Sequence, residues 1–168
     1  MKDFYTKLKT GKHAKGKILI VGFGWGYATK NLIDRKDVSE VTTVEISQDN
    51  INSAKDKVKN SNKHTFVNKD LREYKTTKKY DFIYIDIFND STEEFFGPVR
   101  DFIPKVVGML KNEGRLAIEW QGDIPIENEL RAYILDYFDE DEVEHVVPIK
   151  NGSALRSQSG HIKYYIAK

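Results

Sequence analysis

The sequence contains no cysteine, which excludes disulfide bonds, zinc–thiolate sites and thiol nucleophiles. It has no apolar run near the roughly 18 residues that a membrane-spanning helix needs, and its Lys-rich residues 1–16 lack the hydrophobic segment of a secretion signal. The histidines, at positions 13, 64, 145 and 161, lack the spacing of metal ligands, so no metal is predicted. These absences favour a cytoplasmic protein with no membrane partner.

The net charge of +1 conceals an uneven distribution along the chain. Residues 1–80 hold 18 Lys and Arg against 9 Asp and Glu, whereas residues 81–168 hold 9 against 17. Solvated faces on one domain are the simplest explanation; a basic edge for an anionic partner, or self-association into a homo-oligomer, would also explain it. No aromatic stripe for base stacking accompanies the lysines, so nucleic acid is not the expected partner, although charge alone does not exclude it.

The length of 168 residues predicts one domain spanning 1–168, with a short helix and loop over 1–16. Apolar or β-branched segments alternate with helical patterns along it. The predicted strands are 17–21, 40–45, 64–67, 80–86, 115–120, 143–149 and 161–167, and the predicted helices are 27–33, 48–59, 93–110 and 125–137. We expect Gly97, Pro98 and Pro104 to kink or divide the third helix. This order predicts an α/β fold: a Rossmann-like, seven-stranded, mostly parallel sheet with a C-terminal antiparallel strand and helices on both faces.

Three glycines at alternate positions follow the first strand: Gly22, Gly24 and Gly26. Glycine lets backbone approach a ligand closely, and a turn between a strand and a helix is the usual place for a nucleotide-type cofactor. The third glycine of the dinucleotide fingerprint would fall at Tyr27, which disfavours an NAD-linked oxidoreductase. Phe23 and Trp25 are unusually large for such a turn, and the sequence leaves open whether they cover a ligand or contact a partner.

Two carboxylates follow the next two strands. Glu45 ends the second strand, where a carboxylate can accept hydrogen bonds from both hydroxyls of a ribose. Asp70 follows the third strand and can accept an adenine amino proton, or it can cap a helical turn over Leu71 to Tyr74. Ser47 has the position of an N-cap for the helix between them.

These motifs resemble those of class I S-adenosylmethionine-dependent methyltransferases, and most closely the spermidine-synthase-like branch. The resemblance covers about residues 16–120 and rests on Val21 to Gly26, Glu45, Asn68 to Asp70 and Tyr80 to Asp86. It implies S-adenosylmethionine as the cofactor, lying across the carboxyl ends of the first four strands. The residues that it assigns to cofactor binding are Gly22, Phe23, Gly24, Gly26, Glu45, Ile46, Asp70, Leu71 and Asp86. Within that set the glycine turn would hold the methionine part, Glu45 the ribose, and Ile46 and Asp70 the adenine.

Asp86 and Asp90 are the predicted catalytic residues. A carboxylate at the end of the fourth strand can orient an acceptor amine and accept its proton during direct displacement at the sulfonium-bound carbon. We therefore expect transfer, most simply of a methyl group, to a small or amine-bearing acceptor. Aminopropyl transfer from decarboxylated cofactor is an alternative. Two observations count against aminopropyl transfer. The two aspartates of aminopropyltransferases lie three residues apart and are followed by a proline, whereas Asp90 lies four residues after Asp86 and is followed by Ser91. The N-terminal β-domain of that family is also missing. A non-catalytic cofactor-binding module is a further alternative.

Overall fold

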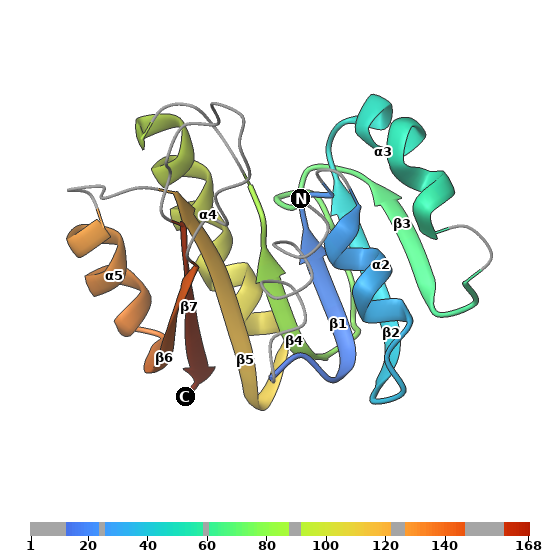
Figure 1. Cartoon of the computed structure of the whole chain (residues 1–168). Helices are drawn as coiled ribbons and strands as arrows, with labels where there is room; N and C mark the ends of the chain where they lie inside the picture. Colours follow the sequence, from blue (N-terminus) through green and yellow to red (C-terminus); the bar gives the residue numbers. More distant parts are fainter. Residues whose placement is uncertain (1–12, 24–25, 59–60, 88–91, 122–126, 147–159) are drawn as a thin grey trace.

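A seven-stranded sheet forms the centre of the computed structural model, which describes residues 13–23, 26–58, 61–87, 92–121, 127–146 and 160–168 (Figure 1). The strand order is β3-β2-β1-β4-β5-β7-β6. Neighbours from β3 to β5 pair in parallel, whereas β7 pairs antiparallel with both β5 and β6. The strands are β1 (Gly16–Val21), β2 (Val38–Glu45), β3 (His64–Asn68), β4 (Tyr80–Ile85), β5 (Leu110–Gln121), β6 (Phe138–Val146) and β7 (Gly160–Ala167). The predicted fold class and the antiparallel C-terminal strand are confirmed.

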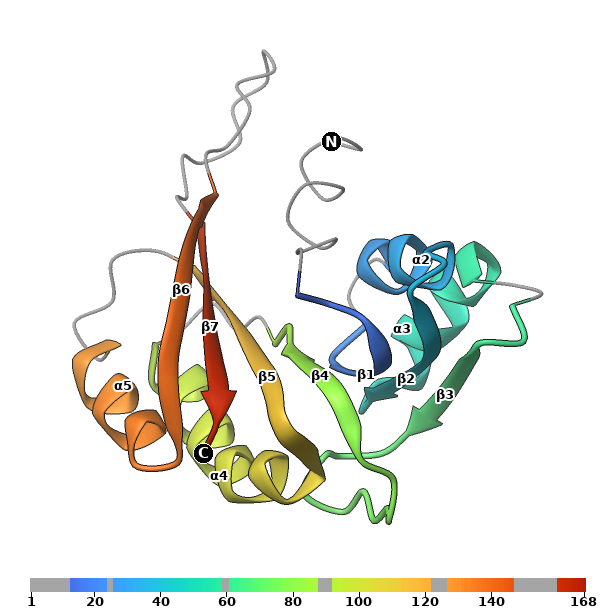
Figure 2. The same ribbon diagram turned by 90° about the horizontal axis from the view of Figure 1, so that it is seen from below.

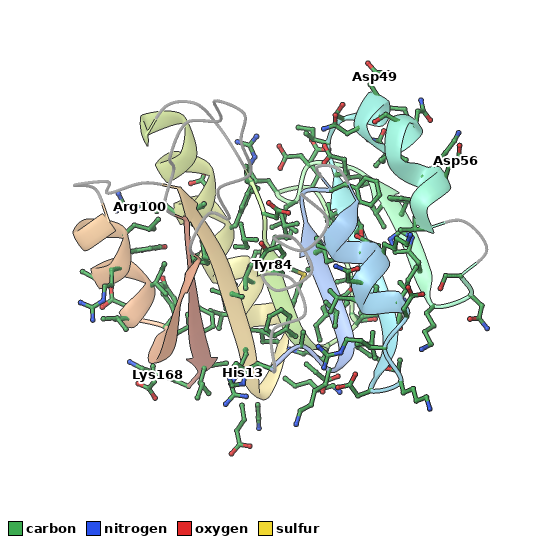
Figure 3. The ribbon with its side chains drawn as sticks, viewed as in Figure 1. His13, Asp49, Asp56, Tyr84, Arg100 and Lys168 are labelled. Carbon is green, nitrogen blue, oxygen red and sulfur yellow. The ribbon has the colours of Figure 1, made fainter. Side chains whose placement is uncertain are left out.

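Helices cover both faces of this sheet, as predicted. One face carries α2 (Tyr27–Ile33), α3 (Gln48–Ala54) and the 3-10 turn η1 (Lys55–Val58), and the opposite face carries α4 (Thr92–Met109) and α5 (Glu127–Leu135) (Figure 2). Arg100 of α4 lies over the ring of Tyr133 of α5, 5.1 Å from its centroid, and joins the two helices (Figure 3). The connection from β3 to β4 contains no helix.

The central strands are buried on both faces, because helices cover each side. In β1, Ile18 and Ile20 pack in the cluster beneath α2, whereas Leu19 and Val21 pack in the cluster beneath α4. All four side chains are almost inaccessible to solvent, and fully burying such a side chain is worth about 1.5–3 kcal/mol. The first strand is therefore fixed between two cores, and its carboxyl end holds the glycine turn in place.

The structure corrects two kinds of prediction about secondary structure. The third helix is not divided, because α4 runs from Thr92 to Met109 although Pro104 lies within it, and a kink there stays a prediction. Val99, Phe102, Ile103 and Val106 remain buried on either side of the exposed proline, and burying four such side chains at about 1.5–3 kcal/mol each outweighs the proline penalty of about 3 kcal/mol.

The second correction concerns where strands begin: β5 begins at Leu110 rather than at 115, and β6 begins at Phe138 rather than at 143. The acidic residues after Phe138 are typical of a solvated loop, which is what the sequence predicted. Charged residues are also typical of an edge strand, and β6 is the outermost strand of the sheet. The fully buried Phe138 starts this strand. Residues 147–149 of the predicted strand lie outside the described residues.

None of the helices in the described part of the chain has the length and apolarity required to cross a membrane.

Candidate functional site

Gly22 brings the ends of three strands together. Its N–H donates to the carbonyl of Val44 in β2 at 2.9 Å, and the N–H of Asp86, just after β4, donates to Val21 at 2.8 Å. Gly22 has a φ of +87°, and a Cβ at this position would lie 2.2 Å from the carbonyl oxygen of Asp86. Only glycine fits here, because the turn passes directly between β2 and β4.

The ring of Phe23 lies in the core beneath the turn. It is 2% exposed and packs edge-on against Phe66 of β3 with ring centroids 4.7 Å apart. Gly26 has a φ of +73°, and a Cβ there would lie 2.7 Å from this ring. Phe23 therefore supports the turn from the core side, so any ligand contact that it makes comes from its backbone. Gly24 and Trp25 lie outside the described residues.

Glu45 is a buried carboxylate at the end of β2, 6% exposed. Its Oε2 accepts a hydrogen bond from the N–H of Phe23 at 2.8 Å, and its Oε1 accepts from the N–H of Ser47 at 2.7 Å and lies 3.5 Å from Nδ2 of Asn50. Ser47 caps α3 as predicted, accepting from the N–H of Asn50 at 3.2 Å. The carboxylate of Glu45 thus joins the glycine turn to the start of α3.

Ile46 follows this buried carboxylate. Among the residues that the structure describes, it is the one large apolar side chain that is exposed, at 69%. Asn68, at the end of β3, donates its Nδ2 to the carbonyls of Glu45 at 2.9 Å and Ile46 at 3.0 Å. Asn68 belongs to the motif Asn68 to Asp70 on which the family resemblance rests, but the resemblance assigns it no role, so these hydrogen bonds were not predicted. The two hydrogen bonds hold the backbone that presents both Glu45 and Ile46.

The predicted turn over Leu71 to Tyr74 is present, and Asp70 caps it. Its Oδ1 accepts from the N–H of Arg72 at 2.8 Å, and its carbonyl accepts from the N–H of Tyr74 at 3.1 Å. The Arg72 guanidinium also donates to both carboxylate oxygens and holds the pKa of Asp70 below its usual range. Leu71 is buried in the α4-side core. Contact of Asp70 or Leu71 with adenine stays a prediction.

Asp86 lies beside Gly22 and is 4% exposed, whereas Asp90 lies outside the described residues. The acidic side chains of the neighbouring α3 and η1, Asp49 and Asp56, point into solvent on the outer side (Figure 3). The sheet therefore brings together two buried acidic residues at its carboxyl edge, Glu45 and Asp86, on either side of the glycine turn.

A polar network lies below the turn on the α2 side of the sheet. Nε2 of His64 lies 2.9 Å from the hydroxyl of Thr43, which lies 3.2 Å from that of the buried Thr29. Burial lowers the pKa of His64 to about 4, so the imidazole is neutral at neutral pH. The ring of His64 also stacks on that of Phe23, with centroids 6.5 Å apart.

Residues 4–143 match the family model described as "methyltransferase small domain". The chain belongs to this family. The cofactor of this family is S-adenosylmethionine, as expected from the sequence. The matches do not indicate the spermidine-synthase-like branch, and they give no support to aminopropyl transfer.

Sequence and structure comparisons agree with this assignment. The chain is 33% identical over 105 residues to the malonyl-[acyl-carrier protein] O-methyltransferase of Acetivibrio thermocellus; the match covers 62% of the chain and only 35% of that relative. The chain thus spans about a third of the length of this curated relative. The N-methyltransferase NodS of Bradyrhizobium japonicum WM9 has the same fold, with a TM-score of 0.76, 16% identity, and coverage of 99% of this chain and 93% of NodS. A second NodS structure, in complex with S-adenosyl-L-homocysteine, matches with a TM-score of 0.75 and 15% identity, and the match covers 99% of this chain and 85% of that one.

Proposed function

We propose that this protein transfers the methyl group of S-adenosylmethionine to a small or amine-bearing acceptor. The observation that carries the proposal is the pairing of a buried carboxylate, Glu45, with an exposed apolar neighbour, Ile46, at the carboxyl edge of the sheet. Membership of the methyltransferase small domain family supports it.

The residues at this edge fit an adenosyl group. A carboxylate offers about four acceptor positions, and the described contacts of Glu45 are two short backbone hydrogen bonds and one long one from Asn50. The carboxylate of Glu45 can therefore accept further hydrogen bonds, which the two hydroxyls of a ribose would donate. Ile46 offers apolar surface of the kind that covers an adenine ring, and Asn68 fixes the backbone between them. Gly22, which has no side chain, leaves the turn backbone open to the methionine part.

When bound, S-adenosylmethionine supplies an electrophilic methyl carbon on a sulfonium. Asp86 bears the second buried carboxylate beside the turn, and the other, Glu45, is assigned to the ribose. In the proposed reaction its carboxylate orients the acceptor and accepts the proton that an amine loses on attack, a contribution of about 10²–10⁴-fold in rate. Asp90 is proposed as a second contact for a cationic acceptor.

The acceptor atom is the open part of the proposal, because the relatives named above differ in it: one name specifies O-methylation and the other N-methylation. A suitable experiment offers S-adenosylmethionine together with amines, peptides and acyl-carrier-protein-linked carboxylates, and measures release of S-adenosylhomocysteine. We expect release with one class of acceptor. Decarboxylated cofactor with putrescine, scored by methylthioadenosine, tests aminopropyl transfer in parallel.

An Asp86→Asn variant separates catalysis from binding. We expect it to lose turnover by about 100-fold or more, since the amide cannot accept the proton, and to keep measurable binding of S-adenosylhomocysteine, because the amide oxygen can still accept a hydrogen bond from the cofactor. Asp49→Asn, on the outer side of α3, is the matched control and should keep full turnover. Cofactor binding without turnover on any acceptor would instead indicate a non-catalytic module and contradict the proposal.

A further inference from the structure

The connection between β3 and β4 leaves part of the sheet without a helix. Residues 69–79 form one hydrogen-bonded turn at Asp70 to Tyr74 and then run as irregular chain to β4. α3 lies on the other side of the sheet, whereas on the α4 side this irregular segment leaves the end of β3 and runs to the start of β4 (Figure 2).

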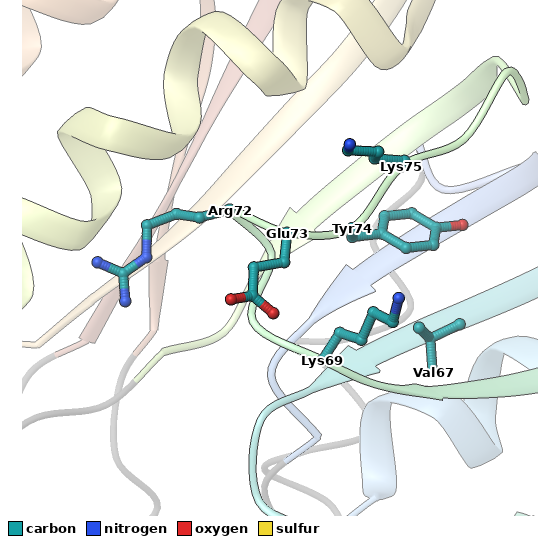
Figure 4. Close-up of a pocket in the computed structure, with 6 residues that line it drawn as sticks. All are labelled: Val67, Lys69, Arg72, Glu73, Tyr74 and Lys75. Atoms are coloured by element: carbon teal, nitrogen blue, oxygen red, sulfur yellow. The ribbon is translucent and has the colours of Figure 1, made fainter.

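A hollow of about 610 Å³ lies at this place. Its lining combines the half-buried Val67 of β3 and the buried Tyr74 with four exposed, charged side chains, and consists of Val67, Lys69, Arg72, Glu73, Tyr74 and Lys75 (Figure 4). The hydroxyl of Tyr74 is occupied in the core, 2.9 Å from that of Tyr80. The hollow thus has apolar surface from Val67 and Tyr74, and its charged walls carry three cations against one acid.

Two of these cations have no partner in the described part of the chain. Arg72 pairs with Asp70, and outside the hollow Lys79 donates its Nζ to the carbonyl of Gly108 at 2.6 Å. The side-chain amines of Lys69 and Lys75, by contrast, make no ion pair or hydrogen bond among the described residues, although the backbone N–H of Lys69 donates to the carbonyl of Glu45 at 3.2 Å.

A further lysine of α4 reaches the same region. Lys105 donates its Nζ to the carbonyl of Arg72 at 2.6 Å. Burial lowers the pKa of Lys105, the carboxylate of Asp70 raises it, and the positive charge of Lys75 lowers it. Lys105 therefore adds a fourth cation to Lys69, Arg72 and Lys75, beside the two carboxylates of Asp70 and Glu73.

We propose that this hollow is a binding site for a small organic phosphate, whose phosphate group is held by Lys69 and Lys75 and whose apolar part lies over Val67. Its volume falls within the roughly 300–1,000 Å³ typical of small-molecule sites. Lysine binds phosphate as a point charge, so two unpaired lysines suit a group with two or more negative charges. The site is separate from the proposed methyl-transfer chemistry, which lies beside Asp86.

Titration calorimetry with inorganic pyrophosphate at low ionic strength tests the proposal without any methyl-transfer assay. We expect the wild type to bind, and the double variant Lys69→Gln/Lys75→Gln to bind about tenfold or more weakly, because it removes both unpaired positive charges that would hold the phosphate. Both lysines are exposed, so the melting temperature should not change.

The matched control is Lys30→Gln/Lys36→Gln, which removes the same charge from exposed positions around the end of α2. It should bind pyrophosphate like the wild type. Equal weakening in both double variants would show a general charge effect and overturn the site, as would a wild type that binds no pyrophosphate.

Discussion

Replacing Gly22 by alanine tests whether the glycine turn is placed as described. The added Cβ would lie 2.2 Å from the carbonyl oxygen of Asp86, and the backbone at Gly22 has a φ of +87°. The chain has little room to shift, because the N–H of Gly22 is bonded to Val44 and that of Asp86 to Val21.

The expected cost follows from these contacts. Alanine in the left-handed region costs about 1–2 kcal/mol, and disturbing the two hydrogen bonds costs about 0.5–1.5 kcal/mol each. We therefore expect Gly22→Ala to lower the free energy of unfolding by about 3 kcal/mol, a large part of the roughly 5–15 kcal/mol typical of a domain. Urea denaturation followed by circular dichroism measures this change.

Gly108→Ala is the matched control. Gly108 lies in α4, and a Cβ there meets nothing within 4 Å. The same substitution should therefore stabilise the protein by about 0.5–1 kcal/mol through helix propensity. The account of the turn is refuted if Gly22→Ala stays within about 1 kcal/mol of the wild type, or if Gly108→Ala costs as much.

Two further predictions concern the support of the site. Asn68→Ala removes the two hydrogen bonds to Glu45 and Ile46, worth about 0.5–1.5 kcal/mol each, so we expect calorimetry to show S-adenosylhomocysteine binding at least about fivefold more weakly. Asn62→Ala, before the start of the same strand, should have no effect on binding. Equal affinities of the two variants would contradict the positioning role of Asn68. The pKa of His64 is about 4 in the folded protein and about 6.5 when unfolded, so stability is full above pH 6.5 and declines as pH falls towards 4. Between about pH 7.5 and 5 the wild type should lose about 1 kcal/mol more than His64→Gln after allowance for solvent screening, as measured by urea denaturation; parallel losses would show that His64 is not buried in its neutral form.

The sequence was sufficient to predict the sheet, because each central strand is an apolar or β-branched segment and the segments between the strands have helical periodicity or turn-forming residues. It also placed Glu45 and Asp86 correctly at the ends of β2 and β4, since strand ends follow from the same segmentation. The place of Phe23 could not be predicted, because it depends on Phe66 and His64 of a distant strand.

The contacts of Asp70 and Asn68 show the same limit. The sequence left two roles open for Asp70; the structure shows the capping role through Arg72, and the adenine role stays a prediction. Asn68 belongs to a motif of the resemblance, but no role was predicted for it, because its hydrogen bonds to Glu45 and Ile46 exist only once β2 and β3 pair. Side-chain partners across strands are set by register and twist, which a single sequence does not encode locally.

Calorimetric titration of S-adenosylhomocysteine into the wild type and Glu45→Gln tests the central claim most directly. We expect one cofactor per chain, and about tenfold or more weaker binding by the variant, because a hydrogen bond to a charged group is worth about 1.5–3 kcal/mol. Glu113→Gln, an exposed position at the opposite edge of the sheet, should bind like the wild type. A wild type that does not bind, or a Glu45→Gln variant that binds equally well, would contradict the account.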